Sequence, residues 1–180
     1  AGMQHPGRFC DGALENAVLE VAATLPRTTF SPRPLVAPAP PNRASRRRVL
    51  HVATVILGIG GHTRTILNWI RKDPASEHSI VATYQGRAAI PAALPATVAE
   101  SGGQLHALPD DVPLTARAAW LREFAAQNAD IVMLHLSPND VIPLAAFAAP
   151  GGPPVGLINL ADQCYWLGGT IADSIVHLRE

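Results

Sequence analysis

Beyond residue 48, apolar positions alternate between short runs rich in β-branched residues and stretches with helical spacing. The short runs predict strands over residues 49–57, 79–84, 104–108, 131–136, 155–159 and 174–178. The helical stretches predict helices over residues 64–72, 95–101, about 114–127, and 137–148. Strict alternation of strand and helix implies right-handed crossovers. The predicted fold class is therefore α/β, a Rossmann-like, doubly wound and mainly parallel sheet of six strands.

The first 45 residues differ from the rest and form a separate region, residues 1–45, ahead of the α/β domain at 46–180. Asp11 is placed to cap one short helix and Pro26 to stop it. Its expected apolar stripe consists of Leu14, Val18, Val21, Ala22 and Leu25. Six prolines then occur between Pro26 and Pro41. Proline cannot donate ladder hydrogen bonds, so we expect an extended strap or linker and no central strand here.

Two helices carry more specific expectations. Ser137 is predicted as N-cap of the helix after the fourth strand, Pro138 as its first-turn proline and Asp140 as its capping-box acid. In the helix before that strand, four polar residues are expected to face away from the sheet: Arg117, Arg122, Glu123 and Gln127. The basic run at residues 46–48 is interpreted as a solvated lead into the first strand.

Ligands of open α/β sheets bind beyond the carboxyl ends of the strands, near the point where strand order reverses. After the first strand, the candidate ligand-binding residues are Gly58, Gly60, Gly61, His62 and Arg64. Glycines allow a ligand to approach the backbone and the free N–H groups of the next helix. The alternative is a turn that serves only strand-to-helix geometry.

Two features of the sequence disfavour a nicotinamide site. Thr63 stands where the dinucleotide pattern has its third glycine, and the second strand ends in Tyr84 and Gln85 without a ribose-binding acid.

The ends of the fourth and fifth strands supply the other candidates. His135 could bind a sugar hydroxyl or accept its proton, although a satisfied core histidine is the alternative. Asn139, Asn159, Tyr165 and Trp166 add amides and aromatic rings, a mixture suited to carbohydrate.

Asp162 is the candidate catalytic carboxylate in this segment, or alternatively an N-cap with Trp166 packed in the core. We expect Gly60, Gly61, His135, Asp162 and Trp166 to line one open cleft.

Composition narrows the classes of function. Fourteen basic and fourteen acidic residues give a formal net charge of zero, so nucleic acid and anionic lipid are poor candidate partners. Two cysteines and no long apolar run favour a cytoplasmic protein without a membrane segment. Motifs of metal sites, P-loops and serine hydrolases are missing from the sequence, so no metal is expected.

Three segments resemble the N-terminal domain of bacterial retaining glycosyltransferases with the GT-B fold, of the group 1 or family 4 type. They are RRVLHVATVILGIGGHTRTILNWI, ADIVMLHLSPND and PVGLINLADQCYWLGGTIADSIVHLRE. The resemblance implies that the glycine turn approaches the substrates and that His135 lies near the acceptor cleft. Asp162 matches the Asp of a His-Asp pair, with Ala161 where the family has His.

The same resemblance implies that the parent protein transfers a sugar from a nucleotide-sugar donor to a hydroxyl acceptor. The nucleotide sugar would be a co-substrate, and no other cofactor is implied. The donor would be held mainly by a C-terminal domain beyond Glu180, so this chain alone is expected to be inactive. The alternative is a Rossmann-like module that binds a ligand or a partner without catalysis.

Overall fold

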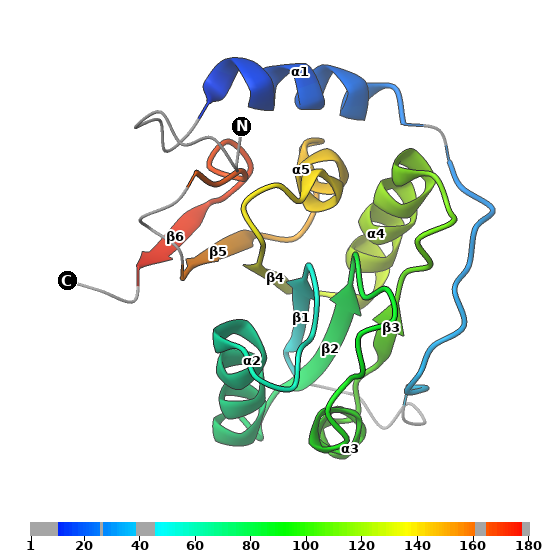
Figure 1. The fold of residues 1–180 in the computed structure, drawn as a ribbon, viewed down its shortest axis with the longest axis vertical. Helices are drawn as coiled ribbons and strands as arrows, with labels where there is room; N and C mark the ends of the chain where they lie inside the picture. Colours follow the sequence, from blue (N-terminus) through cyan, green and yellow to red (C-terminus); the bar gives the residue numbers. More distant parts are fainter. Residues whose placement is uncertain (1–10, 26, 39–45, 161–164, 178–180) are drawn as a thin grey trace.

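The computed structural model describes residues 11–25, 27–38, 46–160 and 165–177. Its centre is one six-stranded sheet in which all neighbouring strands are parallel (Figure 1). The strands are β1 (Arg48–Ala53), β2 (Glu77–Ala82), β3 (Leu105–Ala107), β4 (Ile131–His135), β5 (Val155–Asn159) and β6 (Ser174–His177). The order β3-β2-β1-β4-β5-β6 reverses between β1 and β4. The predicted Rossmann-like fold is confirmed.

Helices cover both faces of the sheet (Figure 1). On one face lie α2 (Gly61–Lys72) and α3 (Ala93–Ser101), and on the other lie α4 (Leu114–Asn128) and α5 (Val141–Phe147). Successive residues of β1 show the division, because Val52 packs in the cluster that contains Leu121 of α4, whereas Ala53 packs with Ile66 of α2. Burial on both faces explains why β4 begins with four consecutive apolar residues.

The helix α1 (Gly12–Ala23) forms an outer layer, packed against α5. Asp11 caps it as predicted, accepting hydrogen bonds from two first-turn amides. The predicted apolar stripe is only partly buried, since Leu14 remains 41% and Val21 52% exposed. Instead, Glu15 is 2% exposed, and its carboxylate accepts hydrogen bonds from the Gly168 amide and from the amide and hydroxyl of Thr170. A buried carboxylate therefore anchors α1.

Replacing Glu15 by Ala should lower the free energy of unfolding by about 2 kcal/mol, because its buried donors lose their acceptor. Urea denaturation would measure this change. The matched control is Glu20→Ala, since Glu20 is an exposed residue of the same helix. Equal effects of the two substitutions would contradict the anchoring role.

The strap after α1 follows the edge of the sheet. Val36 forms an isolated antiparallel bridge with Leu105 of the edge strand β3, and the ring of Phe30 contacts that of Trp120. Within the described part of residues 1–45, no strand enters the centre of the sheet, as predicted. Covering an edge strand also blocks pairing with other chains.

Within the described residues, no helix has the length and apolarity needed to cross a bilayer.

Two predictions about the helices were wrong. The N-cap of α5 is Asp140, not Ser137, and the helix begins at Val141, so Pro138 lies before it. The physical reason is that the Asp140 carboxylate is held by partners from two other loops, which fixes the helix start. Arg117 is 3% exposed and does not face solvent. Its guanidinium donates to the carbonyl of Thr83 at 2.9 Å and lies over the ring of Tyr84.

Candidate functional site

The candidate site lies at the carboxyl edge of the sheet, where the loops after β1 and β4 diverge to opposite faces. Beneath this site, the side chain of Asp140 connects the loops that follow the strands. One carboxylate oxygen accepts a hydrogen bond from the Thr54 hydroxyl at 2.8 Å and another from the Thr83 hydroxyl, while the second oxygen accepts from the Ile142 amide at 3.1 Å. The Thr54 hydroxyl also accepts from the amide of Ser137. These bonds tie together the ends of β1, β2 and β4.

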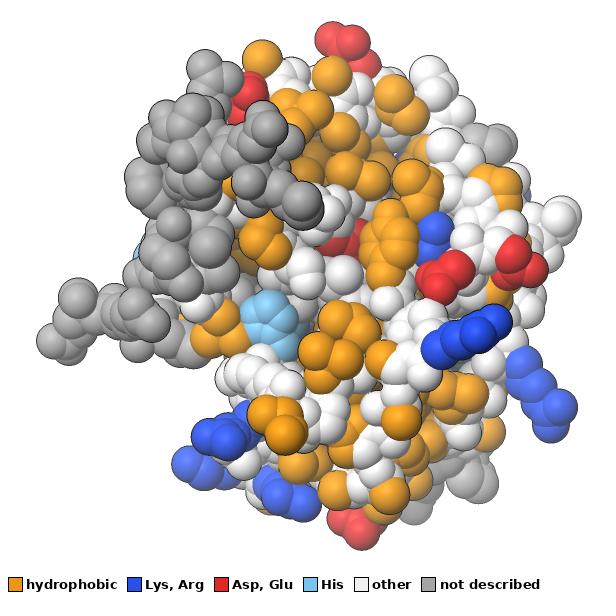
Figure 2. All heavy atoms as spheres, viewed as in Figure 1, with side chains coloured by type: hydrophobic (Ala, Val, Ile, Leu, Met, Phe, Trp, Pro, Cys, Tyr) orange, Lys and Arg blue, Asp and Glu red, His pale blue; other side chains and the backbone are white. Residues whose placement is uncertain are grey.

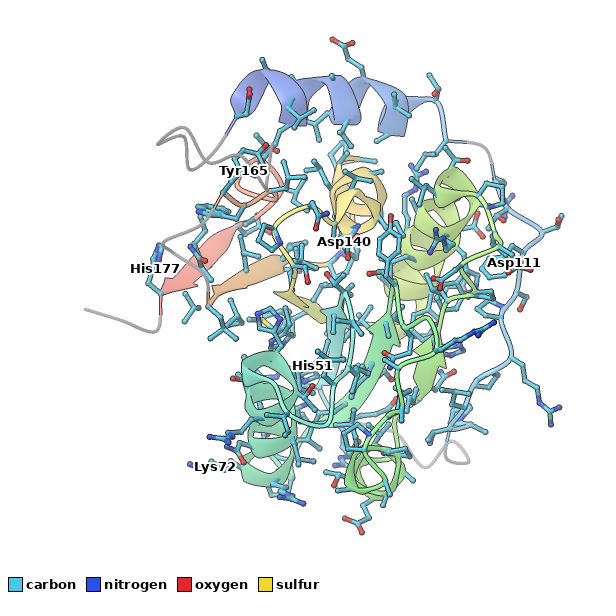
Figure 3. The ribbon with its side chains drawn as sticks, in the orientation of Figure 1. His51, Lys72, Asp111, Asp140, Tyr165 and His177 are labelled. Carbon is cyan, nitrogen blue, oxygen red and sulfur yellow. The ribbon has the colours of Figure 1, made fainter. Side chains whose placement is uncertain are left out.

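Burial dominates the electrostatics of Asp140, which is 1% exposed beside α5 (Figure 3). Desolvation raises the pKa of its carboxyl, and the hydrogen bonds from Thr83, Thr54 and Ile142 counteract that rise. The hydrogen bonds of this carboxylate all come from groups inside the protein, so it acts as a brace under the site. Asp140 was predicted as the capping-box acid of this helix, but it is the N-cap residue itself, one residue before the helix begins.

The glycine turn, residues 58–61, lies above this brace and is exposed. Its glycines adopt no positive φ, and Gly60 is extended at φ −176° and ψ 144°. A Cβ at Gly58 would meet no atom within 4 Å, and a Cβ at Gly60 would have only ordinary contacts, the nearest at 3.7 Å. A Cβ at Gly61 would lie 3.4 Å from Leu160, which follows β5. Neither backbone geometry nor internal packing requires glycine at these positions.

The residues after the glycines begin α2. His62 is half-buried, Arg64 is exposed, and Asn139 is exposed in the loop after β4. Figure 2 shows basic side chains gathered over α2. The first turn of this helix receives no hydrogen bond from a capping side chain. Its amides therefore remain donors for an external group.

Thr63 and Gln85, two residues at which the sequence departs from a nicotinamide-binding pattern, have structural roles. The Thr63 hydroxyl accepts a hydrogen bond from the Leu57 amide, which holds the glycine turn from inside. The Gln85 side chain accepts from the amide of Ile56 and donates to its carbonyl, at 2.9 Å each. These two polar residues therefore fasten the loop after β1.

His135 is fully buried, beneath the site and not on its surface. Its ring lies in edge contact with that of His62, with 6.2 Å between centroids. Its Nε2 lies 3.1 Å from Nδ1 of His51, whose Nε2 lies 3.0 Å from Nδ1 of His78. His51 also contacts Trp69 of α2 (Figure 3). The three rings cross the face of the sheet that α2 covers.

Sequence reasoning missed His51 and His78. The signal in the sequence was a histidine within each of two predicted strands, at a position where a hydrophobic core normally has an aliphatic side chain. Burial lowers the pKa of all three rings, to about 3 for His135. For His51 the neighbouring rings lower it further, and for His135 His62 does so. The rings are therefore neutral near pH 7.

The end of β5 contributes less open surface than predicted. Asn159 is 7% and Tyr165 4% exposed, while Trp166 is half-buried and packs against the main core cluster. The Leu160 side chain lies close to the Gly61 backbone, since an added Cβ would be 3.4 Å from it, so the turns after β1 and β5 are near one another. Asp162, the candidate catalytic carboxylate, lies outside the described residues. Of the five residues predicted to line one cleft, only Gly60 and Gly61 are described as exposed.

Comparisons with protein-family models, with curated proteins and with solved structures found no match.

Proposed function

We propose that this chain is the acceptor-side half of a glycosyltransferase, which moves a sugar from a nucleotide-sugar donor to a hydroxyl acceptor at the carboxyl edge of the sheet. The observation that carries the proposal is the glycine turn. Glycine in a folded chain costs conformational entropy, about 0.5–1 kcal/mol relative to Ala within regular elements. Here no positive φ and no tight internal contact requires it. Close approach of a ligand to the backbone is a function that glycine serves at such a place.

The first turn of α2 supplies the chemistry. Uncapped amides and the positive end of the helix dipole attract oxygen atoms of a phosphate or a sugar. Arg64 adds a positive charge on the same turn, and His62 adds an imidazole. These groups are suited to the diphosphate or the sugar of a nucleoside diphosphate sugar that is held by a facing domain and extends to this edge.

The remaining roles follow the resemblance. Asp162 would contact the reacting sugar, and the half-buried Trp166 and the exposed Asn139 would form walls of the sugar site. Asn159 and Tyr165 are buried and would not contact the sugar directly. The second domain would bind most of the nucleotide, so binding to this half alone is expected to be weak, on the order of millimolar. A non-catalytic ligand-binding module would use the same strand ends without transfer.

Titration of the ¹⁵N-labelled chain with UDP-glucose, GDP-mannose and free hexoses tests this site by NMR. We expect shifts of the amides of residues 58–64. The double variant Gly58→Ala/Gly60→Ala should weaken binding about tenfold, or 1.4 kcal/mol, because two methyl groups occupy the path of the ligand. Its stability should not fall, since both positions accept a Cβ.

The matched control is Gly152→Ala. A Cβ at Gly152 also meets no atom within 4 Å, but this residue precedes β5 at the opposite edge of the sheet. It should bind like the unchanged chain. Unaltered affinity in the double variant, or no shift at residues 58–64 with any of these ligands, would refute the proposed site.

A further inference from the structure

Three buried histidines on neighbouring strands form a continuous hydrogen-bonded row. His135 of β4, His51 of β1 and His78 of β2 are each 0% exposed. The two ring-to-ring distances, 3.1 and 3.0 Å, are those of hydrogen bonds. At the far end, Nε2 of His78 lies 3.1 Å from the backbone carbonyl of Asp73.

The carbonyl of Asp73 fixes the protonation of every ring. A carbonyl only accepts, so His78 must donate to it through Nε2–H, which leaves Nδ1 of the neutral ring as an acceptor. His51 must then donate through Nε2–H to His78, and His135 through Nε2–H to His51. Every hydrogen bond in the row therefore has the same direction.

The row begins at an acceptor that has no internal partner. Nδ1 of His135 is buried and makes no hydrogen bond within the described residues. A histidine that served only to fill the core would leave this acceptor unsatisfied, which is unfavourable for a buried polar atom. His62, which is half-buried at the start of α2, is the ring in contact with His135 on the side of the proposed ligand.

We propose that His135, His51 and His78 form a proton relay between the ligand site at the carboxyl edge and Asp73 at the amino edge. The helix α2 spans the same distance, since His62 lies in its first turn and Asp73 is its C-cap. The ligand as the source of the proton rests on the proposed function, whereas the relay itself is a property of the three rings.

Each transfer conserves atoms and charge. Nδ1 of His135 is buried behind the ring of His62, so a hydroxyl reaches it only when that ring moves aside. The hydroxyl then loses its proton to Nδ1 of His135, and the electron pair of the broken O–H bond stays on oxygen. His135 then passes its Nε2 proton to Nδ1 of His51, which passes its own Nε2 proton to Nδ1 of His78. The Nε2 proton of His78 leaves to the Asp73 carboxylate, 3.6 Å away. All three rings change tautomer and remain neutral.

The exit can release the proton to solvent. The Asp73 side chain is 22% exposed and lies 3.7 Å from the guanidinium of Arg47. The rings themselves stay uncharged between transfers, because burial lowers the pKa of each one. A low-pKa ring passes a proton on and does not retain it.

The test is NMR of the whole chain labelled with ¹⁵N-histidine, at a pH above the ordinary histidine pKa of about 6.5. The probe is the solvent proton itself. All three rings should show the Nε2–H tautomer as the major form, with joint exchange to the Nδ1–H form. Different major tautomers, or rings that show no exchange, would overturn the relay.

The decisive variant is His51→Gln. An amide has an oxygen that can accept from His135 and an N–H that can donate to His78, so it preserves a structural hydrogen-bonded row, but it does not exchange tautomers as imidazole does. Joint exchange at His135 and His78 should be lost while the fold is kept. Continued exchange would overturn the proposal, because the relay would not pass through position 51.

His106→Gln provides a matched control, since His106 is also buried but contacts Trp120 and Phe124 on the other face. It should leave the exchange of the three rings unchanged. If His51→Gln fails to fold, His78→Gln is measured instead, with the same expected loss at His135. These experiments need no ligand, so they can fail or succeed independently of the glycine-turn titration.

Discussion

Acidification from pH 7 to pH 5.5 should lower the free energy of unfolding by about 2.5 kcal/mol through His106 and His135 alone. Burial lowers the pKa of these rings to about 4 and about 3 in the folded chain, against 6.5 for ordinary histidine. The unfolded chain therefore binds more protons in this window. The folded state therefore has its full stability above pH 6.5, where these rings are neutral in both states. This stability is lost as the pH falls below 6.5 toward the pKa values of the rings in the folded chain. His51, whose pKa is also well below 6.5, adds to the loss.

Charged groups near these rings modify the effect but do not reverse its sign. Burial lowers the pKa of His78, Asp73 raises it, and the nearby Arg46 and Arg47 lower it; the net effect is a lowered pKa. Asp140 acts in the opposite direction, because its raised pKa favours the folded state as pH falls. The histidines should prevail because several of them titrate in the same window.

Urea denaturation across pH 5.5 to 7 measures the effect. His106→Gln should remove about 1.2 kcal/mol of the pH dependence, because it deletes one of the buried rings. A variant with the same slope as the unchanged chain would show that His106 is protonated normally. A flat profile for the unchanged chain would show that the buried rings do not have lowered pKa values.

Periodicity was sufficient to predict the sheet and most of its helices. Residues 155–159 were predicted as a strand and form β5, because a short, mostly apolar run between proline-rich and polar segments has few other packing solutions. The glycine turn was also placed correctly, at the edge where ligands bind in such sheets. Its exposure and relaxed geometry could only come from the three-dimensional structure.

Buried polar groups were beyond the reach of pattern analysis, because their partners are distant in sequence. Glu15 is anchored by residues more than 150 positions away, and Arg117 reaches the carbonyl of Thr83, 34 positions away. In a helical pattern both look like solvent-facing charges. The histidine row depends on strand register, which pairs His51 with Met133 and with Ile80 and so places histidines of three strands diagonally beside one another.

Asp140 shows the same limitation and gives the second large prediction. Asp140→Ala should lower the free energy of unfolding by about 3–5 kcal/mol, since the hydroxyls of Thr54 and Thr83 and the amide of Ile142 lose a buried, charged acceptor together. Sequence pattern assigned this residue a minor capping role, worth about 1 kcal/mol. The excess over that value measures the contribution of the tertiary hydrogen bonds.

Two further variants distinguish the brace from an ordinary cap. Asp140→Asn keeps an oxygen for the Ile142 amide, and the threonine hydroxyls can turn to accept from its N–H, so its loss should be only about 1–2 kcal/mol. Asp111→Ala, at an exposed acid of the loop before α4, should change stability by less than about 0.5 kcal/mol. A loss of about 1 kcal/mol for Asp140→Ala in urea denaturation would mean that the carboxylate is merely a helix cap. The ends of β1, β2 and β4 would then be held together by packing alone, and the glycine turn would lie on a less rigid floor.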